Sequence, residues 1–391
     1  MKLTKSLAES PCHVAVFPFP YTSHPLSLLN LVRKLALASP TVRFSFLNTS
    51  NSNNSRFLSP IFQANLDNIT AYDHVEDGVP AGHVISVNSA EAMEFFLEAS
   101  PENFKKAIDI VVAKTGTKIT CLLVDALLST CFADCLALCW LSFTPTSFAN
   151  AAIAVLQLLI IKMKSLVLFL PDRKSPATSA AVVLNSFKEL SPPALHDDFE
   201  SKFRKVLKRS QCRVSNGFLA ATALTALKSD PTGCLTWSDG QNPSSMAYIA
   251  FGTQVLPPIH ELIALAEALE ETKIPFLWSL KDEFRSHLPD GFAEKMSKQG
   301  KITPLLFADN FMNAKMIENV WKIEAKVEGG VLTKSGLVKA LEMVFSDDQN
   351  HGNKMKERAL KLKEIVTEAA GPNGNATPDF KNLVSLVSMK F

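Results

Sequence analysis

The chain has 391 residues, a length typical of two or three domains. Hydrophobic residues make up 47% and charged residues 20%, which is ordinary for a folded globular protein. Because 40 Lys and Arg nearly balance 38 Asp and Glu, the net charge is only +2, which excludes the basic field that nucleic-acid binding needs and favours a small neutral partner.

The chain carries no signal for export or membrane insertion. Residues 1–11 include charges and lead into no apolar h-region, so we predict no secretory signal. Seven cysteines, an odd number, fit reduced thiols better than a disulfide framework. The most apolar stretch, residues 151–170, is interrupted by lysines, and its clean run has about half the length of a membrane span. We expect a buried helix followed by a strand in this stretch. We also expect the chain to be cytoplasmic and to have no integral membrane segment.

The first half of the chain alternates apolar runs with helical patterns. We predict strands over residues 13–19, 42–47 and 119–124, a helix that begins near His24, and a long helical region over residues 90–114 broken near Pro101. The second half repeats the plan with strands over residues 246–251 and 275–280, and a helix after Pro257-Pro258. Such alternation predicts parallel sheets covered by helices on both faces.

The predicted fold is therefore α/β, with two doubly wound, Rossmann-like domains facing across a cleft. We assign residues 1–207 to an N-terminal domain, residues 208–230, which show no clean period, to a linker, and residues 231–391 to a C-terminal domain. Ligands of such sheets bind at the carboxyl ends of the strands.

Two candidate catalytic side chains follow strands in the first half. His24 comes after the first strand and Asp125 ends the strand over residues 119–124, so both could meet at one sheet edge. A histidine can act as a general base near neutrality, and a carboxylate can hold its tautomer and stabilise the imidazolium. The alternatives are a histidine and an aspartate that cap helices.

Other motifs are weaker. Gly252-Thr253 lie between a strand and a helix, where they could contact a phosphate or form an ordinary turn. Neither G-x-x-x-x-G-K-[ST] nor G-x-G-x-x-G occurs. Cys131, Cys135 and Cys139 have a helical spacing but make a poor tetrahedral set, so we interpret them as core residues and predict no metal site.

Several segments together are similar to a known family. They read HVAVFPFPYTSHPLSLLNLVRKLA, DHVEDGVPAGHV, AVVLNSFKELSPPALHDDFESKF, DPTGCLTWSDGQNPSSMAYIAFGT, ALEETKIPFLWSLKDEFRSHLPDGF and KVEGGVLTKSGLVKALEMV. This set resembles the plant family-1 UDP-glycosyltransferases, in particular the flavonoid 3-O-glucosyltransferase branch.

The resemblance implies a GT-B fold and an inverting, metal-independent glucosyltransferase. UDP-glucose would be the co-substrate, and the acceptor would be the 3-hydroxyl of a flavonol or anthocyanidin. His24 would be the base that deprotonates the acceptor and Asp125 its orienting partner. At the donor, Thr253 would contact the phosphates and Trp278-Ser279 would lie beside the uracil. We expect a monomer with no nucleic-acid partner.

The chain departs from this family in the segment that binds the donor. The family has a W-A-P-Q segment, then H-C-G-W-N-S, then a terminal D-Q pair. Here residues 300–304 pass directly into LLFADNFMNAKMIENVW, and only Asp309-Asn310 match the terminal pair. The resemblance therefore implies a shortened C-terminal domain. It leaves open an alternative, a catalytically impaired or inactive member that serves as a flavonoid-binding or partner protein.

Overall fold

In the computed structural model, the parts of the chain that can be described are residues 12–21, 24–54, 58, 66–84, 89–125, 128, 137–141, 179–184, 189, 206–208, 233–242, 245–251, 257–280, 282–303, 327, 331–345 and 352–389. The chain divides into two compact units. Unit 1 comprises Met1–Asn216 together with Glu368–Phe391, and unit 2 comprises Gly217–Thr367.

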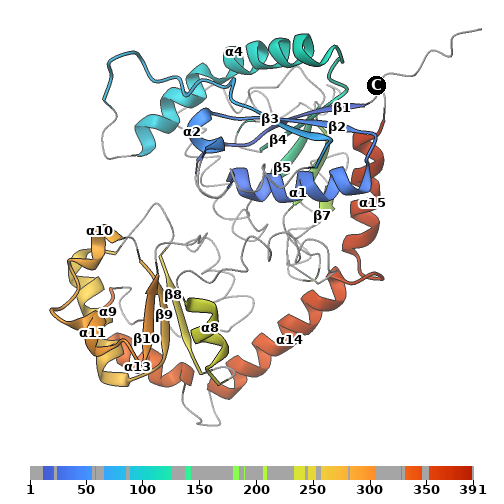
Figure 1. Ribbon diagram of the computed structural model, residues 1–391. Helices are drawn as coiled ribbons and strands as arrows, with labels where there is room; N and C mark the ends of the chain where they lie inside the picture. Colours follow the sequence, from blue (N-terminus) through green and yellow to red (C-terminus); the bar gives the residue numbers. More distant parts are fainter. Residues whose placement is uncertain are drawn as a thin grey trace, which may run out of the picture. The chain divides into compact units, whose positions relative to one another are not determined.

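Within its described residues, unit 1 contains a seven-stranded parallel sheet (Figure 1). In spatial order its strands are β3 (Ile69–Tyr72), β2 (Arg43–Leu47), β1 (His13–Phe17), β4 (Cys121–Asp125), β5 (Ala137–Leu141), β6 (Ser179–Leu184) and β7 (Val206–Lys208). The chain builds outward from β1 to β3 and then resumes on the other side of β1 with β4. A reversal of this kind opens a crevice at the carboxyl ends of β1 and β4.

Helices cover both faces of this sheet, as the doubly wound prediction requires. They are α1 (His24–Ala38), the short α2 (Ser50–Asn53), α4 (Ser89–Thr115) and α15 (Ala376–Val387). Because successive side chains of a strand point to opposite faces, Val14 and Val16 of β1 enter one hydrophobic cluster, while Ala15 and Phe17 enter another.

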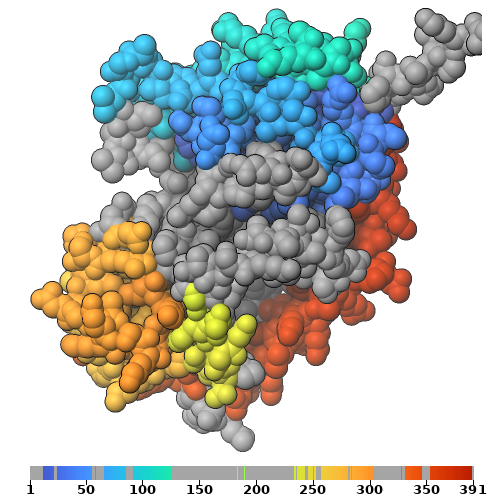
Figure 2. All heavy atoms as spheres, viewed as in Figure 1, coloured from blue at the N-terminus to red at the C-terminus, as the bar shows by residue number. Residues whose placement is uncertain are grey.

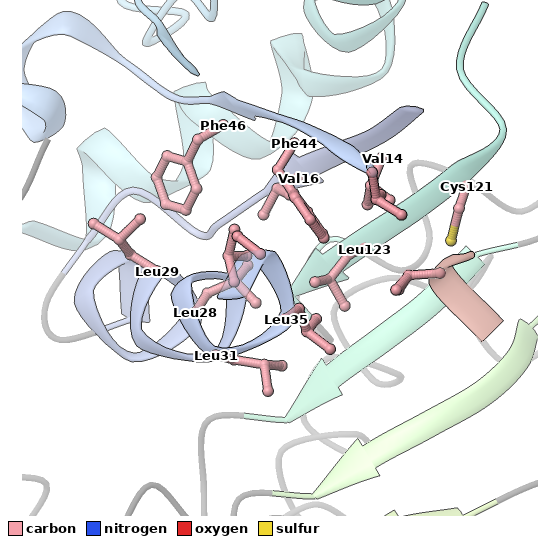
Figure 3. Close-up of a cluster of buried hydrophobic side chains, with 14 of the residues drawn as sticks. Val14, Val16, Leu28, Leu29, Leu31, Leu35, Phe44, Phe46, Cys121 and Leu123 are labelled. Carbon is pink, nitrogen blue, oxygen red and sulfur yellow. The ribbon is translucent and has the colours of Figure 1, made fainter. Parts of the chain in front are cut away.

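Helix α1 contributes more residues to the first cluster than any other helix or strand (Figure 3). Leu28, Val32 and Leu35 recur at the spacing of one helix face and are fully buried. In Figure 3 these leucines point toward the strands, where Phe44 of β2 and Leu123 of β4 meet them. The packing fixes the start of α1, and therefore His24, relative to β1.

Helix α4 covers the opposite face and passes through Pro101 without a break. The prediction of a break there was wrong. Proline removes one helical hydrogen bond, but Phe96 before it and Phe104 after it are buried in the same cluster and hold both halves on one core. The hydroxyl of Ser100 also donates to the Phe96 carbonyl oxygen at 2.6 Å. The outer side chains of α4 form part of the molecular surface (Figure 2).

The C-terminal helix α15 belongs to unit 1, whereas the sequence-based boundaries grouped residues 231–391 together. Leu383 and Val387 are fully buried in the same cluster as β1 and α1. The thiol of Cys12 donates to the Ser388 carbonyl oxygen at 3.2 Å, and the Asn375 amide donates to the Glu189 carboxylate at 2.6 Å. The last turns of the chain thus complete the core of the first unit.

We expect Leu383→Ala to lower the free energy of unfolding of unit 1 by about 2–5 kcal/mol, because it leaves a cavity in a close-packed core. Leu37→Ala is the matched control: Leu37 is 41% exposed on α1, so its truncation should cost about 0.5 kcal/mol or less. Urea denaturation followed by circular dichroism measures both. Equal losses would contradict the packing of α15 described above.

His13 is a fully buried histidine that ties β1 to its neighbours. Its Nδ1 donates to the Thr117 carbonyl oxygen at 3.1 Å, and its Nε2 accepts from the Ser45 hydroxyl at 2.7 Å. Burial lowers the pKa of His13 below 6.5 and the charge of Arg43 lowers this pKa further, while the hydrogen bond to Thr117 opposes both. The imidazole is therefore neutral in the folded chain at neutral pH.

We expect unit 1 to lose stability as the pH falls below about 6.5, because the unfolded chain then binds a proton that folded His13 does not. Above that pH both states are neutral at this residue, and the contribution is constant. Urea midpoints at several pH values would show the slope, and His13→Gln should flatten it. The same slope in both proteins would refute this assignment.

Unit 2 contains a three-stranded parallel sheet in the order β10 (Gly300–Thr303), β9 (Phe276–Ser279), β8 (Ala247–Ala250) among its described residues. Its helices are α8 (Cys234–Asp239), α9 (Ile259–Thr272), α10 (Asp282–Arg285), α11 (Phe292–Lys295), α13 (Lys334–Phe345) and α14 (Gly352–Ala370), whose last turn lies in unit 1. Leu262, Leu265 and Leu269 of α9 pack against β9. The predicted strands and the helix after Pro257-Pro258 are confirmed here.

Some predictions fall outside the described residues. The apolar stretch 151–170 lies there, as does the predicted linker 208–230 apart from Lys208, so the domain boundaries stay a prediction. Cys139 lies in β5, not on a helix. No helix within the described ranges is long and apolar enough to cross a membrane.

Candidate active site

The structure brings His24 and Asp125 together at the crevice edge of the first sheet. His24 is the first residue of α1, and Asp125 is the last residue of β4, the strand next to β1. His24 Nδ1 lies 2.8 Å from Asp125 Oδ2. Both side chains are buried, with 5% and 1% of their surface exposed. The pairing that the strand ends predict is therefore present.

This hydrogen bond assigns the proton on the imidazole. An ionised carboxylate only accepts hydrogen bonds, so Nδ1 of His24 carries the hydrogen and donates to Asp125. In the neutral ring, Nε2 then holds the lone pair. The carboxylate is also placed to stabilise the imidazolium that forms when Nε2 takes up a proton. The pair can act as a general base with a fixed tautomer.

The ring of Phe19 contacts the histidine and belongs to a group of three aromatic rings. Phe19 meets the His24 ring edge-on, with the centroids 5.5 Å apart at 73°. Phe19 also contacts Tyr21 at 5.2 Å and Phe96 at 6.1 Å, and Tyr21 contacts Phe96 at 5.8 Å and 84°. Aromatic pairs in such tilted arrangements contribute about 0.5–1.5 kcal/mol each beyond burial. The rings form a triangle that links the loop after β1 to α4.

Tyr21 also makes a polar contact with α4. Its hydroxyl donates to the Ala92 carbonyl oxygen at 2.8 Å. Burial, and to a lesser degree the negative charge of Asp77, raises the pKa of Tyr21 to about 12. The phenol is therefore neutral, and its hydroxyl remains a donor throughout the physiological pH range.

A turn around Gly78 packs closely on the same half of α4. Gly78 has φ +76°, and a Cβ added there would collide with the Phe95 carbonyl oxygen. Only glycine allows both this backbone conformation and this approach. Farther along the loop, His83 Nε2 lies 2.9 Å from the Glu91 carboxylate. The loop is thus held on α4 beside Tyr21.

A buried polar network shapes the neighbouring strand ends. Asn48, which follows β2, donates to the Ser52 hydroxyl at 2.8 Å and accepts from the Thr49 amide at 2.9 Å. Asn53 of α2 donates to the Asp73 carboxylate at 2.6 Å, which joins α2 to the end of β3. Buried amides with satisfied hydrogen bonds make this rim of the crevice rigid.

The predicted donor residues are only partly described. Thr253, Asp309 and Asn310 lie outside the described residues. Ser279 ends β9 and is buried. Trp278 is fully buried, and its indole packs edge-on against Phe292 with centroids 6.3 Å apart. The indole therefore belongs to the core of unit 2, and a role of Trp278 beside the uracil stays a prediction.

Comparison with known proteins shows which family the chain belongs to. No model of a known protein family matches the chain. The flavonol 3-O-glucosyltransferase F3GT2 of Actinidia chinensis var. chinensis is 34% identical, with 96% of each chain covered. The anthocyanidin 3-O-glucosyltransferase UFGT of Vitis vinifera is 32% identical, covering 96% of this chain and 97% of the relative.

The chain belongs to the flavonoid 3-O-glycosyltransferase branch of the plant UDP-glycosyltransferases. A solved UDP-glucose: anthocyanidin 3-O-glucosyltransferase in complex with UDP supports the assignment, with a TM-score of 0.75 and 30% identity over 96% of this chain and 98% of that one. A UDP-glucosyltransferase from Polygonum tinctorium, at 16% identity and a TM-score of 0.72, shares the fold. The predicted GT-B fold is thereby confirmed.

The alignments also bear on the shortening of this glycosyltransferase. The match to the Actinidia flavonol enzyme extends over 456 positions, more than the 391 residues of the chain. The relative therefore has segments without a counterpart here. This agrees with the absence of W-A-P-Q and H-C-G-W-N-S from the sequence.

Sequence reasoning did not identify the contribution of Phe19, Tyr21 and Phe96. A signal was present, because the aromatic and proline residues of FPFPY immediately precede the segment that ends at His24. Phe96 lies more than seventy positions farther along, however, and no local pattern connects it to the loop.

Proposed function

We propose that this glycosyltransferase moves glucose from UDP-glucose to the 3-hydroxyl of a flavonol or anthocyanidin, with inversion at the anomeric carbon. The observation that carries the proposal is the buried His24–Asp125 hydrogen bond of 2.8 Å at the carboxyl ends of β1 and β4. Relatives at 32–34% identity that are named for flavonol or anthocyanidin 3-O-glucosyl transfer support the substrate class.

In the proposed reaction, His24 Nε2 removes the proton of the acceptor hydroxyl as its oxygen attacks C1 of the glucose. The bond from C1 to the UDP oxygen breaks on the opposite side, so an α-linked donor gives a β-glucoside and UDP. A phenolic hydroxyl is already fairly acidic, so the base needs to act only as the new bond forms. Asp125 stabilises the resulting imidazolium.

At the donor, Thr253 would contact the phosphates, Ser279 would lie near the uridine, and Asp309-Asn310 would contact the sugar. Each missing hydrogen bond to phosphate forfeits about 1.5–3 kcal/mol, so we expect weaker donor binding than in a full-length relative. The similar Actinidia enzyme F3GT1 is an anthocyanidin 3-O-galactosyltransferase, at 32% identity over 99% of both chains. UDP-galactose is therefore the competing donor to compare.

The test uses a flavonol and the matched flavone that lacks the 3-hydroxyl. We expect the purified chain and UDP-glucose to convert the flavonol to a β-linked 3-O-glucoside, identified by mass and NMR, and to leave the flavone unmodified. A glucoside at another position would refute the regiochemistry. Saturable flavonol binding without product would instead favour a flavonoid-binding protein, and product only with an intact relative would favour a partner subunit.

We further propose that the enzyme acts as a cytoplasmic monomer without a metal. The catalytic pair supports the metal-independent part of this proposal, since a histidine base needs no Lewis acid to accept a proton from a phenol. We expect EDTA to leave the rate of glucoside formation unchanged. A loss that Mg²⁺ restores would contradict it, and gel filtration with light scattering would test the monomer.

A further inference from the structure

We propose that Tyr21 is a positioning residue of the transfer reaction: its hydroxyl, anchored on the Ala92 carbonyl oxygen, holds Phe19 against the imidazole of His24 and so fixes the direction of Nε2. The inference rests on the proposed function in that His24 is the base. It assigns a role to a side chain that does not itself touch the reacting atoms.

Two of the contacts to the imidazole ring bear on its orientation. The hydrogen bond from Nδ1 to Asp125 fixes the tautomer and holds one edge of the ring. Phe19 packs against the same ring at 73° with the centroids 5.5 Å apart, and we infer that this contact helps to set where Nε2 points.

Phe19 is itself held by two rings. Tyr21 contacts it at 5.2 Å and 55°, and Phe96 contacts it at 6.1 Å and 74°. Phe96 is a residue of α4 and is almost completely buried in the core, whereas Tyr21 is half-buried and lies on the loop after β1. The position of the loop therefore depends on what anchors Tyr21.

The anchor is the hydrogen bond of 2.8 Å to the main chain of α4. A carbonyl oxygen in the first turns of a helix held on the core is a rigid acceptor, and the raised pKa of Tyr21 keeps the hydroxyl protonated. The phenol thus makes a directional contact that a phenylalanine could not make. It joins the loop that leads to the base to a helix whose position is set by the core.

The role proposed for Tyr21 differs from that of a residue that only fills the core. Phe17 and Phe104, with centroids 4.6 Å apart, fill the core below the triangle. Removing only the Tyr21 hydroxyl retains all three aromatic side chains and deletes one hydrogen bond. Tyr21→Phe therefore separates positioning from burial.

The matched control is Tyr72→Phe. Tyr72 is half-buried on β3, at the far edge of the same sheet, with Lys114 Nζ 5.8 Å above its ring. We expect Tyr21→Phe to lower kcat about 3- to 10-fold, the equivalent of one hydrogen bond. The KM for the flavonol should change by less than about twofold, since ground-state binding is retained. Tyr72→Phe should leave both constants unchanged.

A second kinetic readout distinguishes positioning from general damage. A misplaced base matters less when the acceptor hydroxyl is more acidic, so the loss in Tyr21→Phe should shrink with acceptors of lower hydroxyl pKa. An unchanged kcat, a loss that is the same for all acceptors, or an equal loss in Tyr72→Phe would overturn the proposal.

Histidine ring NMR provides a test without catalysis. With ¹⁵N-labelled histidine, the ring signals of His24 are those that disappear in His24→Gln, and Tyr21→Phe should shift them while Tyr72→Phe should not. If the wild-type chain forms no glucoside but these signals shift, the proposed function fails and the positioning contact stands. Unshifted signals in Tyr21→Phe would refute the positioning contact whatever the activity.

Discussion

Replacing His24 by glutamine is expected to lower kcat by about 10²- to 10⁴-fold, the usual contribution of a general base. Glutamine is chosen because its amide can still donate to Asp125 and fills much of the buried site, so the fold at the start of α1 is retained. The substituted side chain has no group that can take up the acceptor proton. Steady-state glucosyl transfer to a flavonol measures the loss.

His287→Gln is the control for this substitution, because His287 is exposed after α10 in unit 2. It should keep the wild-type kcat. More acidic acceptor hydroxyls should partly restore the rate of His24→Gln, since they need less help from a base. If His24→Gln retains wild-type kcat while folded, His24 is not the base.

Asp125→Asn is expected to lower kcat by about 10²- to 10⁴-fold, because the amide removes the charge and can stabilise the wrong imidazole tautomer. An asparagine NH₂ facing Nδ1 would place the hydrogen on Nε2, the atom that must accept the proton. The side chain is nearly isosteric, so the buried position next to β1 stays filled. Asp109→Asn, on the exposed face of α4, is the control.

The double variant tests whether the two residues act as a unit. Residues that share one catalytic step are strongly non-additive, so His24→Gln with Asp125→Asn should lose little more activity than His24→Gln alone. Losses that multiply would show that Asp125 acts independently of the histidine, for example through the fold of β4.

Much of the first unit could be predicted because its signals are local. Buried parallel strands give short apolar runs, and α1 shows its buried face at helical spacing. The meeting of His24 and Asp125 followed from a general rule, since the carboxyl ends of adjacent strands share one edge. The distance between these two side chains and the tautomer of His24 could be obtained only from the structure.

The remaining features depend on contacts between distant segments. The docking of α15 on the first sheet involves Leu383 and Cys12, at opposite ends of the chain, and an amphipathic helix does not specify which core it covers. Similarly, α4 continues through Pro101 because Phe96 and Phe104 share a core. The burial of Trp278 depends on which face of β9 packs against Phe292.

Titration calorimetry of UDP into the purified 391-residue protein shows whether this shortened chain is still a UDP-sugar transferase. An intact relative is the control for the conditions. We predict saturable binding with a dissociation constant below about 1 mM, which is a binding free energy more favourable than about −4 kcal/mol. The absence of binding at millimolar UDP, by a chain that is folded and still binds a flavonol, would contradict it.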